Sequence, residues 1–141
     1  MKRFLLALAA FAVSFSALAL DHSHKAWDDL LRKHVKYVQN GNASRVDYAG
    51  LARDHAPLKA VLDDYQKVTK AEFDSWTKPQ QQAFLINAYN AFTIEKILTR
   101  YPGIKSIRDF GSVFGNPWKV KFFTLFWQPA YLDFIEHETL R

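Results

Sequence analysis

The sequence places its strongest acid–base pair near the C-terminus, where Glu136 is followed directly by His137. A histidine with a nearby carboxylate can serve as a general base or as a metal ligand. Adjacent residues of a helix lie about 100° apart, so the two side chains are not expected to face each other. One histidine and one glutamate without a third ligand do not make a zinc site. Structural capping or packing of this segment is therefore the alternative interpretation of the pair.

A second group of polar residues, Asn87, Tyr89 and Asn90, lies inside a long apolar segment. The two asparagines are three residues apart and share a helix face, whereas Tyr89 points elsewhere. An unpaired buried amide costs about 1–3 kcal/mol, so these amides need hydrogen-bond partners. They either tie the helix to neighbouring loop backbone, or they bind a polar ligand or orient a catalytic group. The predicted polar site therefore consists of Asn87, Tyr89, Asn90, Glu136 and His137.

The first 19 residues have the three parts of an export signal. Lys2 and Arg3 precede an almost wholly apolar run over 4–15, and the small residues Ala17 and Ala19 follow it. This run is too short for a comfortable bilayer span, and nothing else in the chain is apolar enough to cross a membrane. We expect cleavage after Ala19 and a periplasmic or secreted protein. An uncleaved N-terminal anchor is the alternative.

Cleavage after Ala19 would leave a chain that begins Leu20-Asp21-His22. A free amine, two amide nitrogens and an imidazole at the third position can enclose Cu(II) or Ni(II) in a square plane. His22 is the metal ligand of this hypothesis, and His24 could add an axial contact. A copper titration without a visible d–d absorption band would exclude the site.

The composition limits the classes of function. A chain of 141 residues with 49% hydrophobic and 16% aromatic residues is expected to form one folded domain. The absence of cysteine excludes a disulfide scaffold, a thiolate metal site and a cysteine nucleophile within this chain. Loss of Lys2 and Arg3 removes two charges from the formal net charge of +5, and the other basic residues are scattered among acids. Nucleic acid is therefore not an expected partner.

Hydrophobic periodicity predicts a helix-dominated α+β fold. Helices are expected over 21–40, 54–68 and 77–100. The third is apolar nearly all round, so it should be the buried centre of the domain. Thr77 should cap its start, with Gln80 at the capping-box position.

Shorter elements are expected between and after these helices. They are an extended segment over 46–48, a turn over 71–76, one short helical turn over 106–109, a β-hairpin-like region over 120–130 and a terminal helix over 132–141. Seven aromatic residues in this last part predict a surface for a protein or peptide partner. They are Trp118, Phe122, Phe123, Phe126, Trp127, Tyr131 and Phe134.

Three stretches together resemble the bacterial domain-of-unknown-function family 547. They are QAFLINAYNAFTI over 82–94, Tyr101-Pro102 with SIRD over 106–109, and LDFIEHETLR over 132–141. The family usually has a Gly-rich turn and a Ser before the third stretch, where this chain has Trp127-Gln128-Pro129. Family members also continue past the Leu-Arg pair, with a His-Phe-Ala-Leu-Asn-Cys-Ala-like motif and a second cysteine. The resemblance therefore implies that 20–141 is a single domain corresponding to the family's N-terminal portion, and we expect it to be truncated.

Two classes of function follow. The first is a binding or structural module of the cell envelope, with no catalysis by this chain alone. The second is a fragment of a thiol-dependent enzyme, remotely like papain or transglutaminase folds, whose cysteine lies in the missing portion. The second class is implied by the family's His and Cys motif and by no residue of this chain.

Overall fold

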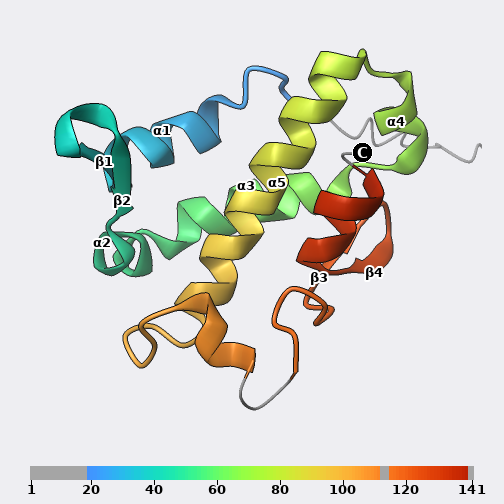
Figure 1. The fold of residues 1–141 in the computed structure, drawn as a ribbon. Helices are drawn as coiled ribbons and strands as arrows, with labels where there is room; N and C mark the ends of the chain where they lie inside the picture. Colours follow the sequence, from blue (N-terminus) through green and yellow to red (C-terminus); the bar gives the residue numbers. More distant parts are fainter. Residues whose placement is uncertain (1–18, 112–114, 140–141) are drawn as a thin grey trace, which may run out of the picture.

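The computed structural model describes residues 19–111 and 115–139, and it shows a helix-dominated fold with two small antiparallel strand pairs (Figure 1). The predicted α+β class is thereby confirmed. The predicted export signal over 1–19 lies, except for Ala19, outside the described residues. Within the part of the chain that is described, no helix combines the length and the apolar character that a membrane span requires.

The first helix is shorter than predicted. Helix α1 (Lys25–His34) ends where strand β1 (Val35–Val38) begins, and β1 pairs antiparallel with β2 (Ala43–Val46). The prediction of one helix over 21–40 was therefore wrong at both ends. The segment Val35–Val38 is rich in β-branched and aromatic residues, and its pairing with β2 outweighs the helical spacing. The extended segment predicted over 46–48 is correct only for its first residue, because the next helix begins at Tyr48.

Three helices connect this hairpin to the centre of the molecule. They are α2 (Tyr48–Arg53), α3 (His55–Lys67) and α4 (Lys70–Ser75). Helix α3 confirms the prediction over 54–68, with Pro57 in its first turn. The segment predicted as a turn over 71–76 is mostly helical instead, because the Thr69 hydroxyl accepts a hydrogen bond from the Glu72 amide and caps α4.

Helix α5 (Lys78–Leu98) crosses the middle of the molecule, as predicted (Figure 1). Its capping box is present: the Thr77 hydroxyl accepts from the Gln80 amide at 3.4 Å, and the Gln80 side chain accepts from the Thr77 amide at 2.9 Å. Phe84, Ala88 and Ala91 have no exposed surface. The long helix is therefore the buried centre of the domain.

The last part of the chain contains a hairpin and a terminal helix, as predicted. After the short helix η2 (Ile107–Phe110), strand β3 (Phe123–Leu125) pairs with β4 (Gln128–Ala130). The terminal helix continues as a π-helical turn, η3 (Phe134–Thr139). In a π-helix the hydrogen bonds run from i to i+5, so the turn is wider than an α-helical turn.

Most of the predicted aromatic surface packs inside this chain. Phe123 stacks on Phe92 with 4.0 Å between ring centroids, and the Phe126 ring lies 4.8 Å from that of Phe73. Trp127, in contrast, is 62% exposed at the tip of the β3–β4 hairpin. The exposed aromatic surface of this part of the chain therefore centres on Trp127.

Candidate functional site

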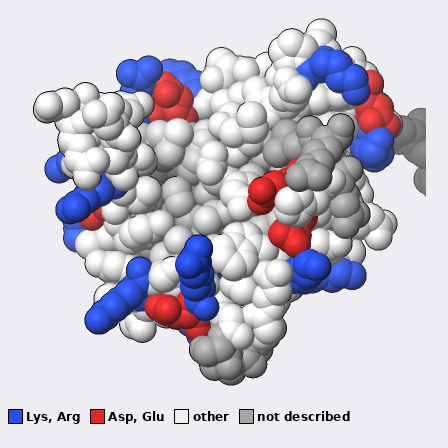
Figure 2. Space-filling model, in the orientation of Figure 1, with Lys and Arg blue, Asp and Glu red and all other residues white. Residues whose placement is uncertain are grey.

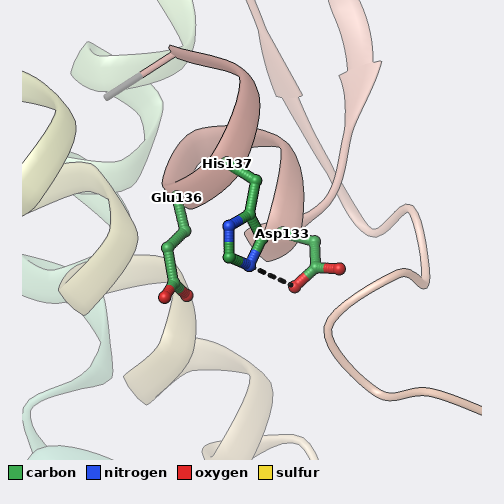
Figure 3. A group of neighbouring side chains, drawn as sticks. All are labelled: Asp133, Glu136 and His137. Carbon is green, nitrogen blue, oxygen red and sulfur yellow. Dashed lines mark ion pairs between the residues drawn. The ribbon is translucent and has the colours of Figure 1, made fainter. Parts of the chain in front are cut away.

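Three possible metal ligands converge on the terminal helix (Figure 3). One ligand atom each of Asp133, Glu136 and His137 lies within 4.8 Å of the other two. The His137 Nε2 is 3.7 Å from the Asp133 Oδ1. Asp133 is thus a third possible ligand, which the sequence pattern did not single out, and it lies beside both residues of the predicted acid–base pair.

The wide helical turn explains this convergence. Residues three and four positions apart share a helix face, which brings Asp133 beside both Glu136 and His137. The widened π-turn, together with two long side chains, lets the adjacent pair reach the same space (Figure 3). Glu136 and His137 therefore share this space because both lie one helical turn from Asp133.

Backbone and side-chain contacts fix Asp133 from the loop that precedes β3. The Asp133 amide donates to the Trp118 carbonyl at 3.0 Å. The Lys119 Nζ lies 3.9 Å from the Asp133 Oδ2, and the side chain of Asp133 is 21% exposed. One carboxylate oxygen therefore lies near a lysine and the other near His137.

Tyr89 links the central helix to this cluster. Burial raises the pKa of the Tyr89 hydroxyl, and the charge of Glu136 and the hydrogen bond with its carboxylate raise it further. The charge of Asp133 acts in the same direction, while a hydrogen bond with Trp118 opposes these effects. Tyr89 is therefore a neutral phenol at physiological pH, and its hydroxyl donates to Glu136.

The other two residues of the predicted polar group are placed differently. Asn87 is half-buried and Asn90 is exposed. Exposure lets an amide bond to water, so Asn90 does not need a protein partner. Of the three residues predicted on α5, Tyr89 is the one that the structure brings to Glu136.

The residues of the amino-terminal metal hypothesis have other contacts. The His22 ring packs edge-on against Trp76, with 4.6 Å between ring centroids. The Leu20 amide donates to the Glu72 Oε1 at 3.1 Å. A square-planar copper site would have to displace both contacts. The copper site at His22 remains a prediction.

The charges on the face that carries the central helix occur in small groups of both signs (Figure 2). No continuous basic stripe crosses this view.

A cluster of two carboxylates and one imidazole suits a positively charged ligand. Imidazole and carboxylate oxygen are both common ligands of Zn²⁺, and carboxylates alone suit Mg²⁺ and Mn²⁺.

The comparisons with known proteins identify one family. Residues 73–141 match the family model described as "Protein of unknown function, DUF547". The comparison with curated proteins and the comparison with solved structures found no match. The matched segment includes the central helix, the β3–β4 hairpin and all three residues of the cluster. The resemblance seen in the sequence is confirmed for residues 73–141, which correspond to a portion of a DUF547 domain.

Proposed function

We propose that this protein is an exported binding module of the cell envelope that holds a divalent metal ion through Asp133, Glu136 and His137. The observation that carries the proposal is the convergence of two carboxylates and one imidazole within 4.8 Å. In a tetrahedral zinc site with bonds of about 2.0–2.2 Å, ligand atoms lie about 3.4 Å apart. Small side-chain rotations can close this difference, because Glu136 and His137 are exposed.

The leader-like sequence over 1–19 supports export to the periplasm or the medium. The absence of cysteine agrees with an oxidising compartment, where a free thiol would be at risk of wrong pairing. A protein or peptide partner at the aromatic region Trp118 to Phe134 belongs to the same proposal, with Trp127 as its exposed residue. In this function the chain binds and does not catalyse.

A zinc titration followed by calorimetry tests the metal site. We expect one zinc ion per chain and an affinity at least about tenfold lower in His137→Ala, because one of three ligands is lost. His22→Ala is the matched control, because it removes only the proposed amino-terminal ligand. Equal isotherms for the wild type and His137→Ala would refute the site, as would loss of binding in His22→Ala alone.

Tyr89→Phe should weaken zinc binding by about 10-fold, within the 10–100-fold range that is typical for loss of a hydrogen bond to a metal ligand. The phenol donates to Glu136 and thereby orients its carboxylate. The fold should be retained, because the ring stays and the side chain is only half-buried. Calorimetry on the variant measures the change, and an unaltered affinity would show that Tyr89 does not support the ligand.

A thiol-dependent enzyme is the second candidate, because one observation favours it. The His137 Nε2 lies 3.7 Å from the Asp133 Oδ1, which is longer than a hydrogen bond, but a small side-chain rotation would give a general base with an orienting carboxylate. The thiol would have to come from outside these 141 residues, since the sequence has no cysteine. This candidate predicts hydrolysis only in a longer product or complex that supplies a thiol, with loss of activity on alkylation by iodoacetamide. The metal-binding function predicts instead that zinc affinity is unaffected by iodoacetamide.

A further inference from the structure

A cavity of about 550 Å³ lies between α1, α3, the start of α4 and the tip of the β3–β4 hairpin. Its walls include Trp27 of α1, Val61 and Tyr65 of α3, Val68 between α3 and α4, and Trp127 of the hairpin. None of the three residues of the metal cluster lines it. Pockets of about 300–1,000 Å³ with mainly apolar walls are typical of small-molecule sites.

The hairpin turn that supplies Trp127 has an unfavourable backbone conformation. Phe126 and Trp127 form a two-residue turn with φ angles of 52° and 63°. Such turns favour Asn and Gly, and a bulky residue at positive φ is an outlier. The packing of the Phe126 ring on Phe73 offsets part of this cost, but Trp127 is 62% exposed. Strain of this kind concentrates at binding sites.

Two residues that line the cavity each have a fully buried nitrogen atom without a hydrogen-bond partner among the described residues. Trp27 is 3% exposed, and its Nε1 has no acceptor among the described residues. The His24 Nε2 is also unpaired, while its Nδ1 shares a hydrogen bond of 3.1 Å with the Tyr65 hydroxyl. Burial lowers the pKa of His24, so the ring is neutral at physiological pH. An unpaired buried donor is costly, and a ligand with an acceptor atom would relieve this cost.

The charged groups at the rim of the cavity already have partners. Both lysines are paired with carboxylates, whereas the Glu72 and Asp21 carboxylates accept hydrogen bonds from neutral donors and keep their negative charge, which disfavours an anionic ligand. The contacts are Lys25 with Asp29 at 2.6 Å, Lys67 with Asp64 at 3.0 Å, Glu72 with the Leu20 amide at 3.1 Å, and Asp21 with the Ser23 hydroxyl at 2.6 Å.

From these observations we propose that the cavity binds a neutral, mainly apolar small molecule with at least one hydrogen-bond acceptor, and that Trp127 forms one wall of this site. The apolar walls take the body of the ligand. The acceptor reaches the indole N–H of Trp27 after a small rearrangement of the ring. The strained turn holds the Trp127 ring against the ligand.

The test uses the chain from Leu20, which contains every described residue except Ala19. The probe is 6-propionyl-2-dimethylaminonaphthalene, a neutral aromatic ketone whose fluorescence shifts to the blue in an apolar site. We expect saturable binding of this ketone with a blue shift, and binding at least about tenfold weaker for the anion 1-anilinonaphthalene-8-sulfonate. An absence of saturable ketone binding, or equal or tighter binding of the anion, would overturn the proposal.

The variant Trp127→Gly should have opposite effects on stability and on ligand binding. Glycine relieves the positive φ, so the variant should have a higher melting temperature, and it should bind the ketone at least about tenfold more weakly. Ala26→Trp, which places a ring in the cavity from an exposed wall position, should also abolish binding. Tyr37→Ala removes another exposed aromatic residue, 81% exposed and outside the cavity walls, and should leave binding unchanged. Unchanged binding in Trp127→Gly, or a lower melting temperature, would refute the role of the turn.

His137→Ala distinguishes this proposal from the metal site. The variant should bind the ketone as the wild type does, because His137 does not line the cavity. Loss of ketone binding in this variant would show that the two sites are not separate and would overturn the inference.

Discussion

Phe84→Ala should lower the free energy of unfolding by about 3–5 kcal/mol, the range for loss of a fully buried phenylalanine. Phe84 has no exposed surface. Its ring is the centre of an aromatic cluster that joins α3, α4, α5 and the β3–β4 hairpin. The neighbouring rings are those of Tyr65 at 5.5 Å, Phe73 at 5.9 Å, Trp76 at 5.3 Å and Phe126 at 6.4 Å. Urea denaturation of the two proteins measures the difference.

Ile86→Ala is the matched control for Phe84→Ala. Ile86 lies two residues further along the same helix and is 50% exposed, so its loss should cost less than about 1 kcal/mol. If Phe84→Ala were no more destabilising than this control, the aromatic cluster would not be the centre of the core.

Gly50→Ala should lower the free energy of unfolding by about 2–4 kcal/mol, through overpacking and loss of a helix cap. A Cβ at this position would overlap the Asp47 Oδ2 and would lie 2.7 Å from the His34 Nδ1. Asp47 caps α2 by accepting from the Gly50 amide at 2.9 Å. The buried His34 ring pairs with Asp54 at 2.7 Å, so neither group can move freely.

Helix propensity alone predicts the opposite result. An alanine in place of a helical glycine normally stabilises by about 0.5–1 kcal/mol. Ala49→Gly in the same helix is the control, and it should cost about that amount. A Gly50→Ala variant that is more stable than the wild type would contradict the close packing of α2 against His34.

The elements that were predicted correctly from the sequence are those whose signals lie close together along the chain. The apolar spacing of 77–100 and the pair of Thr77 and Gln80 are local signals, and they were enough to predict α5. The end of α1 could not be predicted in this way. His34 and Val35 continue a helical pattern, and the strand begins there only because Ala43–Val46 folds back to pair with it.

In the candidate site, too, the residues with a local sequence signal could be predicted, and the contacts between distant segments could not. Glu136 and His137 were found because they are adjacent, and Asp133 was missed although the spacing of three and four residues could have indicated it. The contact of Tyr89 with Glu136 depends on how α5 packs against the terminal helix, which no local pattern encodes. The same is true of the cavity, whose walls come from both ends of the chain.

The location of a bound zinc ion tests the central claim most directly. Crystals of the protein grown with zinc should be measured at the zinc absorption edge, where anomalous scattering identifies the metal. We expect one strong peak bonded to the His137 ring and to the carboxylates of Asp133 and Glu136, and no peak in His137→Ala. A zinc peak at His22 and none at these three side chains would contradict it.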